Sequence, residues 1–128
     1  MFHITALDHI AIGVKDPAAS IEWYERILGL KQLKVKEWGD FPVFMIAENN
    51  SGLAIFSRET GNPVEMPEGR KGGLPHIAFR VTGKDFISAQ EHLQVNGVDF
   101  EFQDHHIAHS IYFRDPDDYA IEITTYEL

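Results

Sequence analysis

Two stretches of the chain repeat the same order of apolar and polar positions. Residues 7–14 read Leu-Asp-His-Ile-Ala-Ile-Gly-Val and residues 74–81 read Leu-Pro-His-Ile-Ala-Phe-Arg-Val, so five of eight positions are identical at an offset of 67. In both stretches aliphatic residues alternate with small or polar ones, which is typical of a half-buried β-strand. A second match aligns Ala-Ile-Phe at 54–56 with Ala-Ile-Glu at 120–122, at an offset of 66. The pattern therefore predicts two copies of one unit.

The residues that follow each of these strands predict an amphipathic helix. In the first copy Asp16 can cap a helix that ends before Gly29. In the second copy Thr82 or Asp85 can open a helix that ends at Gly97. The expected apolar faces consist of Ile21, Tyr24 and Leu28 in the first helix and of Phe86, Ala89 and Leu93 in the second.

Three further strand-like segments follow each helix, so the predicted order is β-α-β-β-β, twice. The segments are 33–38, 42–47 and 52–58 in the first copy and 98–103, 110–114 and 119–124 in the second. We therefore expect an α+β fold in a single domain, residues 1–128, with module one at about 5–58 and module two at about 74–126. Residues 59–73 are rich in Gly and polar side chains and predict a linker.

His9 and His76 occupy equivalent positions in the two copies, on the strand face opposite to the aliphatic residues. By the same alternation Glu122 lies on the histidine side of the last strand. Two imidazoles and one carboxylate form a ligand set for a divalent metal with positions left open for a substrate. We therefore expect His9, His76 and Glu122 to hold Fe, Mn, Zn or Ni, although a single strand histidine is more often a structural residue.

Other side chains could contribute to a binding site on the same face. Arg80 shares the face of His76 and could anchor a substrate carboxylate, or it could form a surface ion pair. Phe44, Phe56 and Trp38 could line an apolar pocket, or they could belong to the core.

Composition narrows the class of protein and the kinds of partner. The 128 residues are 44% hydrophobic and 24% charged, as in a globular domain, and their net charge is −9. This acidity opposes binding to nucleic acid or to an anionic membrane. The chain has no cysteine, which excludes disulfides and a protein thiol nucleophile. No segment is typical of a signal peptide or a membrane span, so we expect a cytoplasmic protein.

Taken in order, these motifs resemble the vicinal oxygen chelate superfamily of glyoxalases, bleomycin-resistance proteins, fosfomycin-resistance thiol transferases and extradiol dioxygenases. The resemblance rests on residues 7–14 with the helix motif Ala-Ser-Ile-Glu-Trp-Tyr, on Pro-His-Ile-Ala-Phe, and on Tyr-Phe-Arg-Asp-Pro-Asp-Asp-Tyr-Ala-Ile-Glu. It implies a cup-shaped mixed sheet with helices on its outer face, a divalent metal, a small-molecule substrate and a homodimer. The modules of such proteins pair within one chain or across two chains.

Within this superfamily the residues narrowly favour a ring-cleaving dioxygenase. His105, Tyr112 and the Asp-Pro pair before Glu122 resemble the C-terminal pattern of that class, although Asp118 replaces its glycine. The resemblance implies that His105 moves protons and that Tyr112 donates a hydrogen bond to bound oxygen atoms. The histidines of this loop could instead be solvated.

Three alternatives stay open. Glyoxalase-like lyases have a further ligand at the end of the first module, where Phe56 stands here and cannot bind metal. The fosfomycin-type thiol transferases fit the three ligands, Ser110 and Tyr112, but Ala11 stands where a hydroxyl is expected. The third alternative is a metal-free protein of the bleomycin-resistance kind, which captures a cationic drug in an acidic dimer cleft. The leading hypothesis is a metal-dependent enzyme that acts on a small oxygenated substrate.

Overall fold

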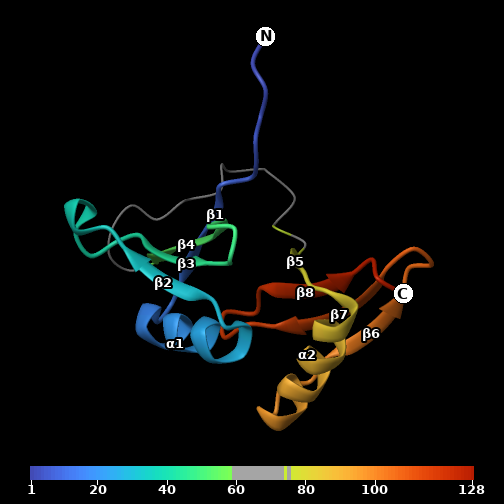
Figure 1. Ribbon diagram of the computed structural model, residues 1–128. Helices are drawn as coiled ribbons and strands as arrows, with labels where there is room; N and C mark the ends of the chain where they lie inside the picture. The colour runs from blue at the N-terminus through green and yellow to red at the C-terminus, as the bar shows by residue number, and fades with distance from the viewer. Residues whose placement is uncertain (59–73, 75) are drawn as a thin grey trace, which may run out of the picture. The chain divides into compact units, whose positions relative to one another are not determined.

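The computed structural model describes residues 1–58, 74 and 76–128, and the chain divides into two compact units, Met1–Glu68 and Gly69–Leu128. Each unit contains one four-stranded sheet and one α-helix (Figure 1). The linker expected at residues 59–73 lies outside the described residues. The expectation of a single domain stays a prediction.

Unit 1 follows the predicted β-α-β-β-β order. Its sheet has the strand order β1-β4-β3-β2, in which β1 runs parallel to β4 and the other neighbours are antiparallel. The elements are β1 (His9–Val14), α1 (Pro17–Leu28), β2 (Lys31–Lys34), the short 3₁₀ helix η1 (Lys36–Trp38), β3 (Val43–Ile46) and β4 (Gly52–Ser57).

Unit 2 repeats this arrangement. Its sheet has the order β5-β8-β7-β6, again with only the β5–β8 pair parallel. The elements are β5 (Ile77–Arg80), α2 (Gly83–Val95), β6 (Glu101–Asp104), β7 (His109–Arg114) and β8 (Ala120–Thr125). The prediction of an α+β fold built from two β-α-β-β-β modules is therefore confirmed.

One predicted strand is too long. The segment 33–38 forms a strand only as far as Lys34, and residues 36–38 form η1 instead. The last cross-strand partners are Lys34 and Val43, and the chain turns away at Gly39, whose φ of 73° is left-handed. The alternation of apolar and polar residues continues beyond Lys34, where β2 no longer has a partner in β3. The pattern therefore does not show where the strand ends.

The helix starts follow the predicted caps. The Asp16 side chain accepts a hydrogen bond from the Ala19 N–H at 3.2 Å, and Gly29 ends α1 with φ 64°. In α2 the cap is Thr82, whose hydroxyl accepts from the Asp85 N–H at 3.1 Å. Asp85 therefore lies in the first turn, where a negative charge is favourable.

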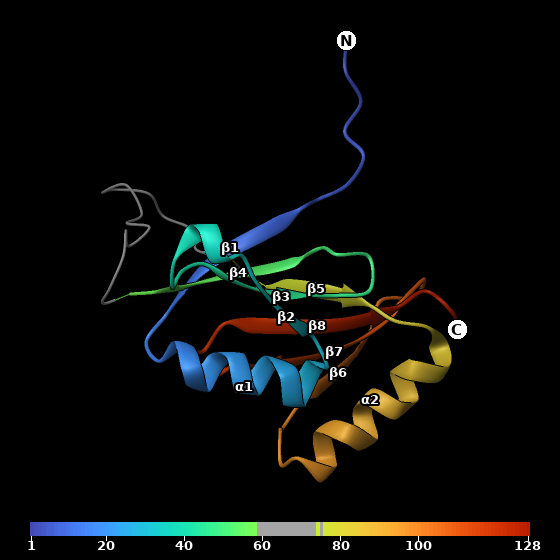
Figure 2. The same cartoon turned by 60° about the vertical axis from the view of Figure 1, so that its left-hand side comes forward.

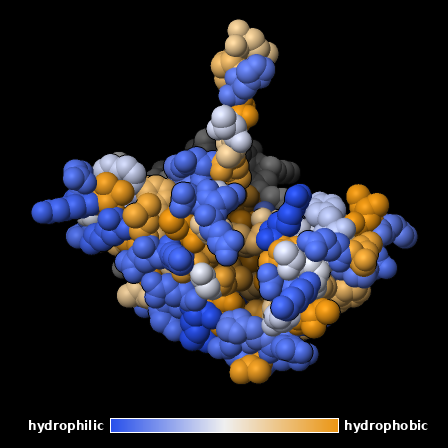
Figure 3. All heavy atoms as spheres, viewed as in Figure 1, coloured by the Kyte–Doolittle hydropathy of each residue, from blue (hydrophilic) through white to orange (hydrophobic). Residues whose placement is uncertain are grey.

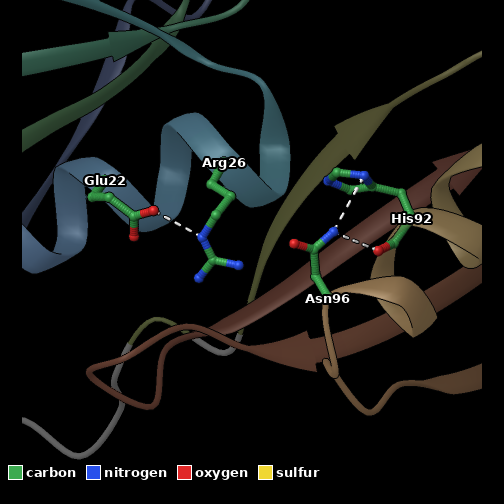
Figure 4. Close-up of polar contacts among 4 residues, drawn as sticks. All are labelled: Glu22, Arg26, His92 and Asn96. Atoms are coloured by element: carbon green, nitrogen blue, oxygen red, sulfur yellow. Dashed lines mark hydrogen bonds and ion pairs between the residues drawn. The ribbon is translucent and has the colours of Figure 1, made fainter.

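Side-chain contacts four residues apart support both helices. In α1 the Arg26 Nε donates to Glu22 at 2.8 Å (Figure 4). At the end of α2 the Asn96 amide donates to the His92 carbonyl at 2.8 Å, which satisfies one of the carbonyls left open at a helix terminus (Figure 4).

One face of each sheet packs against the helix of its own unit, as the two views of the ribbon show (Figures 1 and 2). The buried face of α1 centres on Trp23, Tyr24 and Ile27, so the predicted face is rotated by about one residue. The core consists chiefly of Ile12, Val14, Tyr24, Met45, Leu53 and Ile55 in unit 1 and of Ile77, Phe86, Leu93, Ile111, Ile121 and Ile123 in unit 2.

The first eight residues belong to no helix or strand and expose apolar side chains. Phe2 and Ile4 are 77% and 83% exposed, and apolar residues are visible along this segment in Figure 3. None of the helices in the described part of the chain combines the length and the apolarity that a bilayer crossing needs.

Candidate metal centre

A row of side chains crosses the sheet of unit 2 on the face opposite to α2. The strand register places Glu101, Tyr112, Glu122 and Ala78 side by side, from β6 through β7 and β8 to β5. His76 comes immediately before β5 and lies on the same face as Ala78 by alternation. We call Glu101, Tyr112, Glu122 and Ala78 the polar row.

His76 and Glu122 meet at the end of the polar row. The His76 Nε2 lies 3.0 Å from Glu122 Oε2, and the side chains are 45% and 9% exposed. An imidazole nitrogen and a carboxylate oxygen are both common ligands of divalent metals, and their separation is short enough for both to bind one ion. The pair therefore fits two ligands of such a metal.

Tyr112 lies next to this pair and links it to the loop between β6 and β7. Its hydroxyl is 3.0 Å from the Nε2 of His105, and its ring meets the His76 ring edge-on at 5.9 Å. Burial raises the pKa of Tyr112 above 10.0, and the carboxylate of Glu122 raises it further, whereas a hydrogen bond with Ser110 acts in the opposite direction. Tyr112 is therefore a protonated hydroxyl at neutral pH.

Ser110 is fully buried behind Tyr112. Its hydroxyl donates to Thr124 Oγ1 at 2.9 Å, and Thr124 in turn donates to the His109 carbonyl at 3.3 Å. This chain of hydrogen bonds connects β7 to β8 beside the site.

An open cavity of about 720 Å³ borders the polar row within unit 2. It is lined by His76 and Tyr112, by Arg114, and by the segment 97–101 that leads into β6. The cavity therefore reaches His76 and Tyr112 from solvent.

His9 occupies the position of His76 in unit 1. Its Nδ1 lies 2.6 Å from Asp8 Oδ2, and its ring meets Phe44 edge-on at 5.1 Å. A carboxylate on Nδ1 leaves Nε2 as the nitrogen that can bind a metal. The sequence analysis did not identify this contact, although an aspartate directly before the strand histidine is visible in the sequence.

The register corrects the expected counterpart of Glu122 in unit 1. Ala54 pairs with Ala11 just as Glu122 pairs with Ala78, so Ala54, and not Phe56, stands at the position of Glu122. The buried and half-buried positions of β4 and β8 agree in this alignment, which has an offset of 68. The alignment based on the short Ala-Ile match was wrong because a sequence match does not show which residues pair across the sheet. Alanine, like phenylalanine, cannot bind a metal.

The remaining predicted site residues lie in different places. Arg80 lies at the far end of β5, with its guanidinium carbon 4.8 Å from the centre of the Tyr126 ring. Phe56 is half-buried and pairs with Gly13. The structure thus brings together His76, Glu122, Tyr112, His105 and Ser110 within unit 2. Over the residues that it describes, it contains no group of three His, Asp or Glu side chains arranged to hold a metal.

Comparison with known proteins identifies relatives along nearly the whole chain. The sequence profile of the Glyoxalase/Bleomycin resistance protein/Dioxygenase superfamily matches residues 6–123. The chain is 32% identical over 126 residues to the metallothiol transferase FosB of Staphylococcus haemolyticus, covering 95% of this chain and 84% of the relative.

Solved structures share the fold. A glyoxalase/dioxygenase from Nostoc punctiforme superposes with a TM-score of 0.75 at 24% identity, covering 100% of this chain and 99% of the other. The fosfomycin resistance protein FosX from Listeria monocytogenes superposes with a TM-score of 0.69 at 20% identity, covering 98% and 97%.

Proposed function

The chain belongs to the glyoxalase/bleomycin resistance protein/dioxygenase superfamily, and on this premise we propose that it is a metal-dependent enzyme acting on a small oxygenated molecule. The observation that carries the proposal is the 3.0 Å approach of His76 to the buried carboxylate of Glu122. His9 is the proposed third ligand, because it repeats the position of His76 and turns its Nδ1 to Asp8. It would come from the same chain or from a second copy in a homodimer.

Each of the other predicted site residues has a proposed task. A divalent metal held by these ligands would act as a Lewis acid on a substrate oxygen. Tyr112 donates a hydrogen bond to an oxygen that becomes negatively charged, and His105 holds or returns the proton at the tyrosine oxygen. Ser110 was predicted to bind substrate; because it is fully buried and hydrogen-bonds with Tyr112, the proposed route of its effect on the substrate is through Tyr112. Arg80 binds an anionic group of the substrate, and Phe56 contacts its apolar part.

Thiol transfer is the reaction class that we place first. The relative at 32% identity is named a metallothiol transferase. This chain has no cysteine, so the thiol would enter as a small co-substrate. The sulfur would bond to an electrophilic carbon, the carbon–oxygen bond would break, and the thiol proton would end on the released oxygen.

Ring cleavage by a dioxygenase is the second candidate. The contact of His105 with Tyr112 at 3.0 Å supports it, because such chemistry needs a proton-transfer group beside metal-bound oxygen atoms. The two reactions separate in one experiment. Consumption of a small thiol with an epoxide supports transfer, whereas oxygen uptake with a catechol and Fe(II) supports ring cleavage.

Elemental analysis after loading with Mn(II), Fe(II), Zn(II) or Ni(II) tests the metal site itself. We expect close to one metal per site in the wild type and in His92→Ala, a control on α2 away from the polar row. We expect His76→Ala, His9→Ala and Glu122→Gln to lose it. Absence of metal from the wild type under every condition would refute the proposal and favour a metal-free drug-binding protein, which retains cationic ligands in chelator.

A further inference from the structure

Unit 1 carries an apolar copy of the polar row. Its register aligns Leu33, Phe44, Ala54 and Ala11 across the sheet, from β2 through β3 and β4 to β1. Position by position these residues replace those of the polar row: Leu33 for Glu101, Phe44 for Tyr112, Ala54 for Glu122 and Ala11 for Ala78. We call them the apolar row.

Ring contacts confirm this correspondence independently of the register. His9 meets Phe44 edge-on at 82°, as His76 meets Tyr112 at 80°. On the other side of Phe44, Trp38 lies with its ring centre 5.4 Å away. Trp38 belongs to the connection between β2 and β3, and His105 contacts Tyr112 from the equivalent connection between β6 and β7. Trp38 therefore takes the place of His105.

The aromatic side chains beside His9 are partly open to a ligand. Trp38 is 51% exposed and Leu33 is 46% exposed, while Phe44 is half-buried. Most of the core of unit 1 lies on the other face of the sheet, against α1, and within the apolar row Ala54 is buried at 1% exposure. The four positions of the apolar row carry no charged side chain, unlike the polar row. A flat apolar group would gain stacking contacts here without displacing bound polar partners.

We propose that Trp38 and Phe44, beside His9, bind an aromatic or similarly flat apolar group of the substrate. The claim that this subsite lies beside the reacting centre rests on the proposed function, because it requires His9 to be a metal ligand. Within that function the inference narrows the substrate class to molecules that join an oxygenated reacting group to an aromatic part. Binding of the aromatic group itself requires no metal.

Tryptophan fluorescence gives a direct test, because the chain has two tryptophans and Trp23 is buried in α1 at 9% exposure. The probes are catechol and cyclohexane-1,2-diol, which share ring size and hydroxyl groups and differ in aromaticity. In chelator, we expect catechol to quench Trp38 saturably in the wild type and in Trp23→Phe. Calorimetric titration of the wild type repeats the measurement without any substitution.

Substitution at Trp38 is expected to change affinity for the aromatic probe alone. Because variants at Trp38 lack its fluorescence, their Kd is measured by calorimetric titration. Trp38→Leu should raise the Kd for catechol by about 2- to 10-fold, the range of one aromatic contact, whereas Trp38→Phe should stay close to the wild type. Equal affinity for catechol and the saturated diol, or an unchanged Kd in Trp38→Leu, would overturn the inference. So would a dimer that becomes monomeric in Trp38→Leu without any effect of catechol, because a second copy would then cover this surface.

The two proposals can fail separately. Loss of the metal site with catechol binding retained would remove the proposed function and leave the aromatic subsite. Metal binding without any preference for catechol would leave the function and remove the subsite.

Discussion

Replacing Glu122 with glutamine should change stability little without metal and should remove most of the stabilisation that bound metal provides. The substitution keeps the shape of a side chain that is 9% exposed and removes its charge. In metal-free protein the desolvation of this buried carboxylate offsets its attraction to His76, whose side chain is 45% exposed to solvent. We therefore expect the free energy of unfolding of metal-free Glu122→Gln to differ from that of the wild type by no more than about 1 kcal/mol, in either direction.

The magnitude with metal follows from linkage. At a metal concentration of 100 Kd the bound ion stabilises the folded state by about 2.7 kcal/mol. The unfolding entropy for 128 residues is about 0.27 kcal/mol/K, so the wild-type Tm should rise by about 10 °C. A loss of 100-fold in affinity leaves only about 0.4 kcal/mol at the same concentration, or a rise of about 1–2 °C.

Scanning calorimetry of the wild type and the variant, in chelator and in excess metal, measures both quantities. Glu101→Gln is the matched control, because Glu101 lies beside Tyr112 in the same row but is exposed. It should retain the full metal-induced rise in Tm. The reasoning is refuted if Glu122→Gln keeps more than half of that rise, or if Glu101→Gln loses as much.

Substitutions at three further positions test other contacts. Asp8→Ala removes the partner of the His9 Nδ1 and should weaken metal binding by about 10- to 100-fold in a chelator competition. Asp8→Asn should lose less affinity. Equal metal affinities of Asp8→Ala and the wild type would contradict a role for this contact. Asp115 is buried and accepts two backbone N–H groups at 2.9 and 2.8 Å, so Asp115→Ala should cost about 3 kcal/mol in urea denaturation, and a cost below about 1 kcal/mol would be inconsistent with both bonds. The raised pKa of Tyr112 means that the folded, metal-free protein keeps a proton that the unfolded chain releases near pH 10.0, so stability should fall as the pH rises further. Tyr112→Phe should be less sensitive there, and parallel pH profiles for the two proteins would refute this.

The sequence predicted the elements well where local chemistry decides them. Asp16 and Gly29 bound α1 because an aspartate can accept backbone N–H groups and a glycine tolerates left-handed φ. The alternation in the repeated strand also placed His76 and Glu122 on one face, and the structure brings them to 3.0 Å.

The failures concern positions that depend on pairing between strands. The counterpart of Glu122 was assigned to Phe56 from a short sequence match, whereas the cross-strand register assigns Ala54. Asp118, noted as a departure from a glycine, has φ 68°, a conformation that aspartate tolerates better than most residues. Register arises from contacts between distant segments, so it cannot be predicted from one strand alone.

The matching rows have a consequence for how such a chain can diversify. Residues on the helix-packed faces keep the aliphatic character that specifies register in both copies, whereas the open-face positions have diverged from carboxylate and phenol to methyl and phenyl. Duplication of a folding unit lets the residues that specify the scaffold stay the same while the residues that carry the chemistry change. One copy can therefore preserve an ancestral reactivity while the other explores new ligands by single substitutions, at little risk to folding.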